Sequence, residues 1–152
     1  MFRWIVELHS FDGHLPLAKD MKEKDCKSIV LELSFGGTFP WAPPFARIIR
    51  PRFLDFAHGG GGNVTQGGAI CSEILVTDGW LPSYSIEKVI MQIRLQLCDM
   101  DRPARLLLRG PAAASDYSVG EAIDAYKRAA LSHGWTVSAD LNHIVASLTN
   151  GV

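Results

Sequence analysis

A glycine-rich segment in the middle of the chain limits what this sequence can fold into. Residues 59–68 contain six glycines, in the run GGGGNVTQGG. Glycine loses more conformational entropy than any other residue in a helix or strand, so the segment favours neither. Two interpretations remain open: a flexible surface loop, or a backbone that comes unusually close to a ligand. The regular elements must lie on either side of it.

The residues before this segment predict an antiparallel meander. Alternating apolar positions indicate strands at Phe2–His9, at Ser28–Phe35 and, more briefly, at Phe45–Ile49. Residues 11–27 contain a turn signal at Asp12-Gly13 and then polar residues, which predict a loop. Three prolines in residues 40–44 prevent regular structure before the third strand.

The residues after the segment predict helices. Apolar positions three and four apart indicate helices at Ser85–Cys98, at about Val119–Ser132 and at Leu141–Leu148, with Gly134 ending the second. Strands followed by helices predict the α+β class. Residues 1–152 have the length of one ordinary domain, without an internal repeat.

Composition excludes several classes of function. The net charge is −1, from 15 basic and 16 acidic residues, so we expect no nucleic acid and no membrane as partner. No signal peptide or spanning segment is evident, and three cysteines are too few for a disulfide framework. We therefore expect a cytoplasmic or nuclear protein with free thiols, and no metal site.

Cys71 is the candidate nucleophile, although its neighbours alone do not decide it. A cysteine between Ile70 and Ile74 is by default a small buried hydrophobe. No lysine, arginine or histidine adjoins it to lower the pKa of its thiol. The wider sequence favours catalysis.

Several motifs follow one another in a specific order across the chain. They are FPWAPP at residues 39–44, Asn63, GAIC at 68–71, EIL at 73–75, GWLP at 79–82, and then the predicted helix. This order resembles the ubiquitin-conjugating enzymes. GGAICSE at 67–73, SYSIE at 83–87 and HGW at 133–135 are similar to the divergent Q-type branch, which fungal proteins sometimes carry beside other enzymatic domains. The chain is therefore also consistent with a piece of a larger protein.

The resemblance implies a fold and a reaction. The fold is a four-stranded antiparallel meander, an active-site loop, a crossover helix and C-terminal helices. The family's first helix has no counterpart before the strand at Phe2. The reaction is formation of a thioester between Cys71 and ubiquitin or a ubiquitin-like protein received from an activating enzyme. The domain itself then needs no cofactor.

Asn63 is the second candidate catalytic residue. It stands eight residues before Cys71, as the family's motif asparagine does, and a fixed donor there would stabilise the oxyanion. Gly61-Gly62 replaces the family's His-Pro before it. The alternative is that Asn63 is a turn residue, because asparagine tolerates left-handed backbone.

The acceptor of the cargo is less clear from the sequence. The family's acidic acceptor residue has no clear counterpart, and Asp99, Asp101 and Asp116 are weak candidates. The resemblance leaves Tyr84, His133 and Trp135 as candidates for a hydroxyl-accepting site, with His133 as general base. Each has a simpler alternative: a packed tyrosine, a surface histidine or a core tryptophan.

Partner contacts and rival functions complete the predictions. Trp41, Leu81 and Pro82 match the loops that contact RING-type ligases, although Trp41 could instead fill the core beneath the Pro-Pro turn. The main rival function is a catalytically inactive ubiquitin-binding scaffold of the same fold. A more distant rival is an unrelated cysteine hydrolase, which would need a histidine near Cys71.

Overall fold

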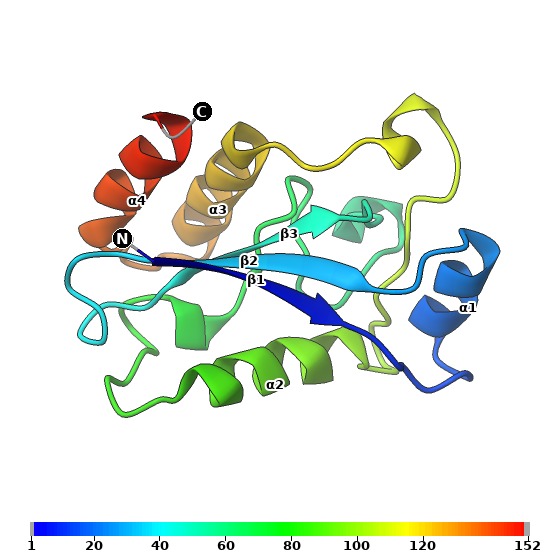
Figure 1. The fold of residues 1–152 in the computed structure, drawn as a ribbon, viewed down its shortest axis with the longest axis horizontal. Coiled ribbons are helices and arrows are strands. Elements are labelled where there is room, and N and C mark those ends of the chain that lie inside the picture. The colour runs from blue at the N-terminus through cyan, green and yellow to red at the C-terminus, as the bar shows by residue number, and fades with distance from the viewer. Residues whose placement is uncertain (1, 151–152) are drawn as a thin grey trace.

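The computed structural model describes residues 2–150, and its centre is a three-stranded antiparallel sheet. The strands are β1 (Phe2–Leu8), β2 (Ile29–Phe35) and β3 (Phe45–Arg50), and they lie side by side in that order (Figure 1). The register pairs Val6 of β1 with Leu31 of β2, and Leu31 with Ile48 of β3. All three predicted strands are confirmed, with their ends within one residue.

The expected fourth strand is replaced by a shorter pairing. Within residues 2–150 the sheet has three strands, and residues 68–70 only begin a fourth. The Ile48 N–H donates to the carbonyl of Gly68 at 2.7 Å, and the Ile70 N–H donates to the carbonyl of Ala46 at 3.0 Å. Gly68 has φ +87°, so the backbone turns away from extended geometry before a longer ladder can form.

A short helix, α1 (Pro16–Glu23), lies where we expected a loop. Pro16 suits a first helical position, and Leu17 and Met21 lie one turn apart on its buried face. The buried carboxylate of Asp20 accepts from Arg105 at 2.7 Å, which fixes α1 to a distant segment. Eight residues with one apolar pair give too weak a period to predict this helix.

The three helices predicted after the glycine segment are confirmed. They are α2 (Ile86–Leu97), α3 (Val119–His133) and α4 (Asp140–Asn150). Ser85 caps α2 by accepting from the N–H of Lys88 at 3.1 Å, as its position suggested. Three short 3₁₀ turns accompany them, η1 (Phe56–His58), η2 (Glu73–Leu75) and η3 (Pro111–Ala114).

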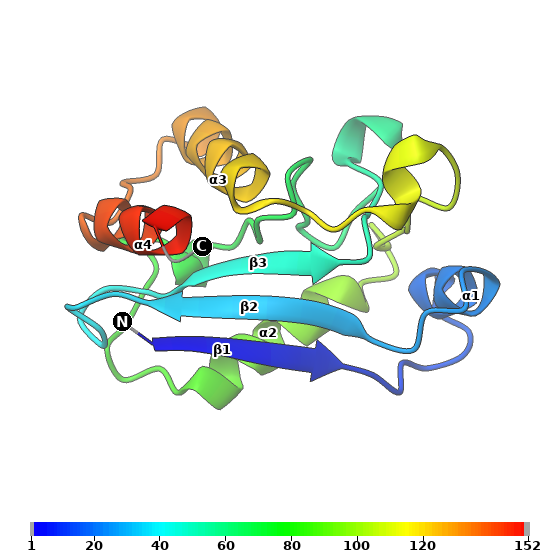
Figure 2. The ribbon, with the colours of Figure 1, turned by 45° about the horizontal axis from the view of Figure 1, so that its top comes forward.

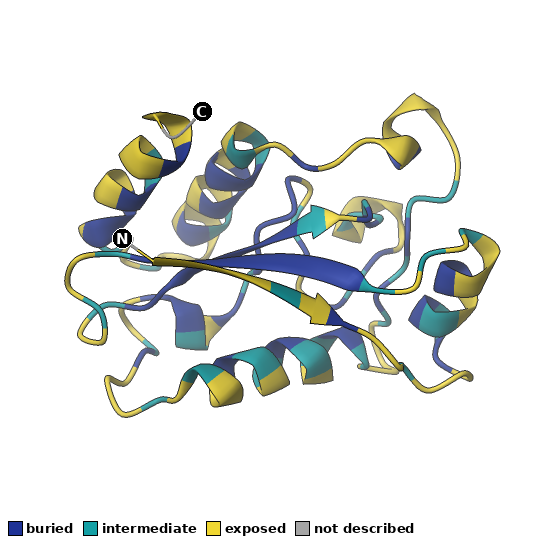
Figure 3. Cartoon of the chain, in the orientation of Figure 1, coloured by how far each residue is buried: buried dark blue, intermediate teal, exposed yellow. Residues whose placement is uncertain are grey.

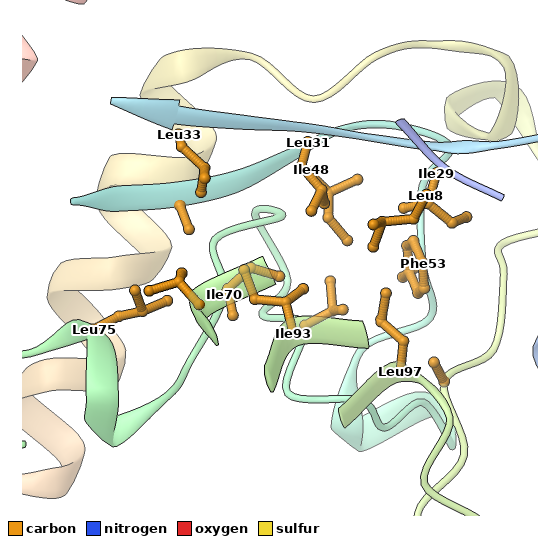
Figure 4. Packing of buried hydrophobic residues seen from close by; sticks show 14 of the residues in the cluster. Leu8, Ile29, Leu31, Leu33, Ile48, Phe53, Ile70, Leu75, Ile93 and Leu97 are labelled. Carbon is orange, nitrogen blue, oxygen red and sulfur yellow. The ribbon is translucent and has the colours of Figure 1, made fainter. Parts of the chain in front are cut away.

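Helices lie on both sides of the sheet, although most of β1 stays exposed. Leu31 and Ile48 project toward Ile93 and Leu97 of α2, and Ile70 joins the same cluster (Figure 4). On the opposite side, α3 and α4 pack near β3 around a second cluster (Figures 1 and 2). That cluster contains Phe45, Tyr126, Leu141, Ile144 and Leu148.

Every residue of β2, the central strand of the sheet, is buried (Figure 3). The sequence predicted only one buried face of this strand. Glu32, on the second face, is accommodated because Arg47 of β3 donates to it at 2.9 Å. A buried charge of this kind is tolerated only when it is paired.

None of the helices in residues 2–150 is long and apolar enough to span a bilayer. Within the same residues, no cluster of three or more histidine, cysteine, aspartate or glutamate side chains forms a metal-binding arrangement.

Candidate active site

Cys71 lies where the chain leaves the sheet. Ala69 and Ile70 are buried against β3 and the core, whereas the Cys71 side chain is half-buried. The Cys71 N–H donates to the carbonyl of Asn63 at 2.8 Å, and η2 begins two residues later. Cys71 is thus held by the backbone on both sides while its thiol reaches the surface.

The thiol opens into a groove of about 1120 Å³. One wall comes from α2 and the other from α3, whose contributing residues follow a helical spacing of three and four. The glycine-rich loop and the residues after α3 close its ends. The helix residues that form these walls include Gln92 and Gln96 of α2 and Ala125, Arg128, Ala129 and Ser132 of α3.

The glycines around Cys71 are required by packing. A Cβ at Gly67 would lie 2.1 Å from the carbonyl oxygen of Glu121 on α3. A Cβ at Gly61 would lie 2.0 Å from the carbonyl oxygen of Arg102. The structure gives a third explanation for these glycines, because the close approach is to the protein's own backbone and not to a ligand.

Asn63 lines the same groove and has the backbone of a turn residue. Its φ is +61°, a left-handed conformation that asparagine tolerates better than most residues. Gly62 before it has φ +71°, which proline cannot adopt. This loop conformation therefore excludes the family's proline at position 62. Within residues 2–150 the Asn63 side chain makes no hydrogen bond, and its role as oxyanion donor stays a prediction.

The electrostatics around Cys71 favour a neutral thiol. Burial raises the pKa of Cys71 above its ordinary value, and no cationic group among residues 2–150 offsets that effect. Burial raises the pKa of Tyr126 on α3 to about 12, with a second contribution from the Cys71 thiolate that forms only at high pH. Tyr126 is therefore an uncharged neighbour of the thiol, and it packs edge-on against Phe45 at 5.6 Å.

Two of the three acceptor-site candidates lie in the groove. His133 and Trp135 both line it, and their rings stack with centroids 4.3 Å apart and an interplanar angle of 17°. Tyr84 is not among the lining residues. Its ring contacts Trp80 edge-on at 5.6 Å, and the Lys88 ammonium lies 4.3 Å above it.

The groove also contains residues that the sequence did not single out. Asp99, Asp101 and Asp116 do not line it, whereas Asp55 and Glu73 do. Asp55 is engaged by His58 at 2.6 Å, but Glu73 is exposed beside Cys71.

A further pair stands in the wall next to the thiol. The Gln96 amide donates to the hydroxyl of buried Ser72 at 3.1 Å, which joins α2 to the residue after Cys71. The sequence contained two signals for this pair. Ser72 follows Cys71 directly in the motif, and Gln92 and Gln96 lie one turn apart on α2.

The predicted ligase-contact residues lie on neighbouring exposed loops. The Trp41 side chain is 76% exposed, so the alternative of a core plug is wrong. Leu81 and Pro82 are also exposed. The indole N–H of Trp80 donates to the carbonyl of Pro40 at 2.8 Å and ties the two loops together.

The structure is thus an α+β domain with a half-buried cysteine at a groove lined by two helices, an arrangement that leaves the thiol accessible to a partner's reactive group. A sequence model described as "Ubiquitin-conjugating enzyme" matches residues 26–114, more than half of the chain. The chain therefore belongs to the ubiquitin-conjugating enzyme family.

The similar proteins carry Q-type names. The Drosophila melanogaster ubiquitin-conjugating enzyme E2 Q-like protein CG4502 is 35% identical over 91% of this chain and 44% of its own length. The Homo sapiens ubiquitin-conjugating enzyme E2 Q-like protein 1 is 34% identical over 89% of this chain and 81% of its own. The Homo sapiens ubiquitin-conjugating enzyme E2 Q1 is 37% identical over 89% and 31%. The chain thus spans less than half the length of two of these relatives.

Proposed function

We propose that this protein forms a thioester between Cys71 and ubiquitin or a ubiquitin-like protein and passes the cargo to an acceptor amine or hydroxyl. The observation that carries the proposal is the half-buried Cys71 thiol at a groove of about 1120 Å³. A groove of this size can admit an extended peptide tail on one side of the thiol and an acceptor group on the other.

The first step is transthiolation. The Cys71 sulfur attacks the carbonyl carbon of the thioester on the activating enzyme, and the activating enzyme's sulfur leaves with the electron pair and is protonated. Because burial raises the pKa of Cys71, its proton must be removed as the sulfur attacks. A thiol kept neutral between reactions is also less prone to oxidation.

The second step transfers the cargo from the thioester. An acceptor nitrogen or oxygen attacks the same carbonyl carbon, the oxygen gains negative charge, and the Cys71 sulfur leaves. The exposed Asn63 side chain at the groove edge is the candidate donor to that oxyanion. His133, stacked on Trp135, is the candidate base for a hydroxyl acceptor, and Glu73 is a candidate partner for an amine acceptor.

A charging reaction tests the proposal. The protein is incubated with an activating enzyme, ATP and ubiquitin, and the products are separated on non-reducing gels. We expect a reductant-sensitive adduct that Cys71→Ala abolishes and Cys98→Ala retains, since Cys98 lies just after α2 and outside the groove. Failure of Cys71→Ala to remove the adduct would contradict the assignment.

Discharge of the charged protein separates the acceptor classes. Free lysine, serine and threonine are compared as acceptors for wild type, His133→Ala and Glu73→Gln. The hydroxyl-acceptor hypothesis predicts that His133→Ala slows discharge to serine and threonine by about tenfold or more. Discharge to lysine alone, slowed only by Glu73→Gln, would refute that hypothesis and leave the thioester proposal intact.

The exposed loops suit the expected partner proteins. Trp41 and Leu81 offer apolar side chains on adjacent loops, which is the type of surface that anchors a protein partner such as a RING-type ligase. We expect Trp41→Ala to lower ligase-stimulated discharge without changing thermal stability or unstimulated charging. The inactive-scaffold alternative predicts binding of ubiquitin without any adduct on Cys71.

A further inference from the structure

We propose that the free edge of β1 is a dimerisation surface that pairs with β1 of a second copy of this chain, producing a six-stranded sheet. β1 is the outer strand of the sheet, and within residues 2–150 only β2 pairs with it. Figures 1 and 3 show the strand at the front of the molecule, exposed along most of its length. An open strand edge is a ready template for another strand.

The sequence of β1 is complementary to itself when it is reversed. An antiparallel pairing of all seven residues places its two-fold axis at Ile5, the middle residue. Arg3 of one copy then stands opposite Glu7 of the other, and this occurs twice in each dimer. Opposite charges at directly facing positions favour pairing, while like charges disfavour it.

The remaining positions of the same register are all apolar. Phe2 faces Leu8, Trp4 faces Val6, and Ile5 faces Ile5 across the axis. In the single chain, the Phe2, Trp4 and Ile5 side chains are 76%, 51% and 56% exposed. Aromatic residues opposite aliphatic ones stabilise paired strands, so dimer formation would cover three large exposed side chains.

The charged groups at this edge are available for the pairing. Within residues 2–150, no ion pair holds Glu7, and Arg50, the cation near it, is already engaged by Asp116 at 3.1 Å. Arg3 lies 3.7 Å from Glu32, whose own close partner is Arg47 at 2.9 Å. Pairing two edge strands covers less than the ~1,600 Å² of a standard interface, so the association should be concentration-dependent.

Charge exchange tests the pairing directly. Sedimentation of the 152-residue chain is measured over a range from about 1 μM to about 500 μM, where weak dimers dissociate and form. We expect a reversible dimer that Glu7→Arg weakens at least tenfold, because Arg3 then faces arginine. The double variant R3E/E7R restores the opposite charges and should restore the dimer.

Two further samples control for other causes. Mixing Arg3→Glu with Glu7→Arg should produce a heterodimer, although each variant alone is monomeric. Ile5→Thr keeps a β-branched residue at the axis and should keep the dimer. Thermal melting checks that every variant is folded. If Arg3→Glu is unstable because its new carboxylate faces Glu32, the Glu7→Arg variant alone tests whether the dimer forms through β1.

Two results would overturn the proposal. One is a monomer at every concentration, and the other is a dimer that ignores both charge reversals, which would form through a different surface. If the protein is a monomer and Glu7→Arg weakens its binding to ubiquitin, the edge is assigned to the cargo instead.

Discussion

The contact between the Cys71 loop and α3 can be tested with one methyl group. In Gly67→Ala the new Cβ would lie 2.1 Å from the Glu121 carbonyl oxygen and 2.7 Å from the Ala125 Cβ. To reach an ordinary contact of 3.4 Å, the loop must move away from α3 by about 1.3 Å. Gly67 stands four residues before Cys71, and we expect part of this displacement to reach the thiol.

The expected loss has two parts. Forcing a methyl into a packed contact costs about 1–3 kcal/mol of unfolding free energy. A displacement of about 1 Å at a reacting group costs roughly 100-fold in rate. We therefore expect Gly67→Ala to charge with ubiquitin about 10- to 100-fold more slowly at a temperature where it is still folded.

Matched glycine variants separate these effects from a general response to alanine. Gly13 and Gly37 have nothing within 4 Å of an added Cβ, so Gly13→Ala and Gly37→Ala should charge and melt like wild type. The assay is the initial rate of adduct formation on non-reducing gels, with thermal melts in parallel. Wild-type rate and stability in Gly67→Ala would refute the close packing of this loop on α3.

Three other predictions concern stability and reactivity. Hydrogen bonds from Arg52 lower the pKa of Glu121 to about 2, so the pair stabilises the fold above pH ~5, and this stabilisation is lost as pH falls toward 2. Glu121→Gln should lower the free energy of unfolding by about 1 kcal/mol at pH 7, a small value because the 39% exposed carboxylate is screened by solvent. In denaturation curves near pH 2, wild type and variant should be equally stable. Asp140→Ala removes the acceptor of the Thr38 N–H (2.9 Å) and hydroxyl (2.5 Å). It should lower the free energy of unfolding in urea by about 1–3 kcal/mol, and an unchanged midpoint would contradict a role for this contact. Because burial raises the pKa of Cys71, its alkylation by iodoacetamide, followed by peptide mass spectrometry, should still accelerate at pH 9, and a plateau below pH 8 would refute the neutral thiol.

The elements that the sequence predicted well have strong local signals. β2 alternates at Ile29, Leu31, Leu33 and Phe35, and α2 has both its apolar period and its cap at Ser85. These patterns depend on neighbours within one turn or one strand, so they are visible in a single sequence.

The features that were missed depend on distant partners. α1 is stabilised by Asp20, whose partners Arg105 and Leu106 lie 85 and 86 residues away. The fourth strand is cut short by the conformation of Gly68, which the residue type permits but does not require.

The site shows the same division between local and distant information. Cys71 and Asn63 follow from ordered motifs, and the structure gives the contact between their backbones. The exposure of Trp41 and the separation of Tyr84 from His133 depend on how loops and helices pack together. Motif order alone contains none of that information.

The central claim is that Cys71 carries the cargo, and intact mass spectrometry of the charged protein tests it most directly. Wild type should gain the mass of one ubiquitin less one water, lose it on addition of thiol, and yield a Cys71 peptide attached to the ubiquitin tail. Cys71→Ser should form an adduct that resists thiol but is cleaved by hydroxide, because an oxyester replaces the thioester. No adduct with ubiquitin or any ubiquitin-like protein, or an adduct mapped to Cys26 or Cys98, would contradict the account.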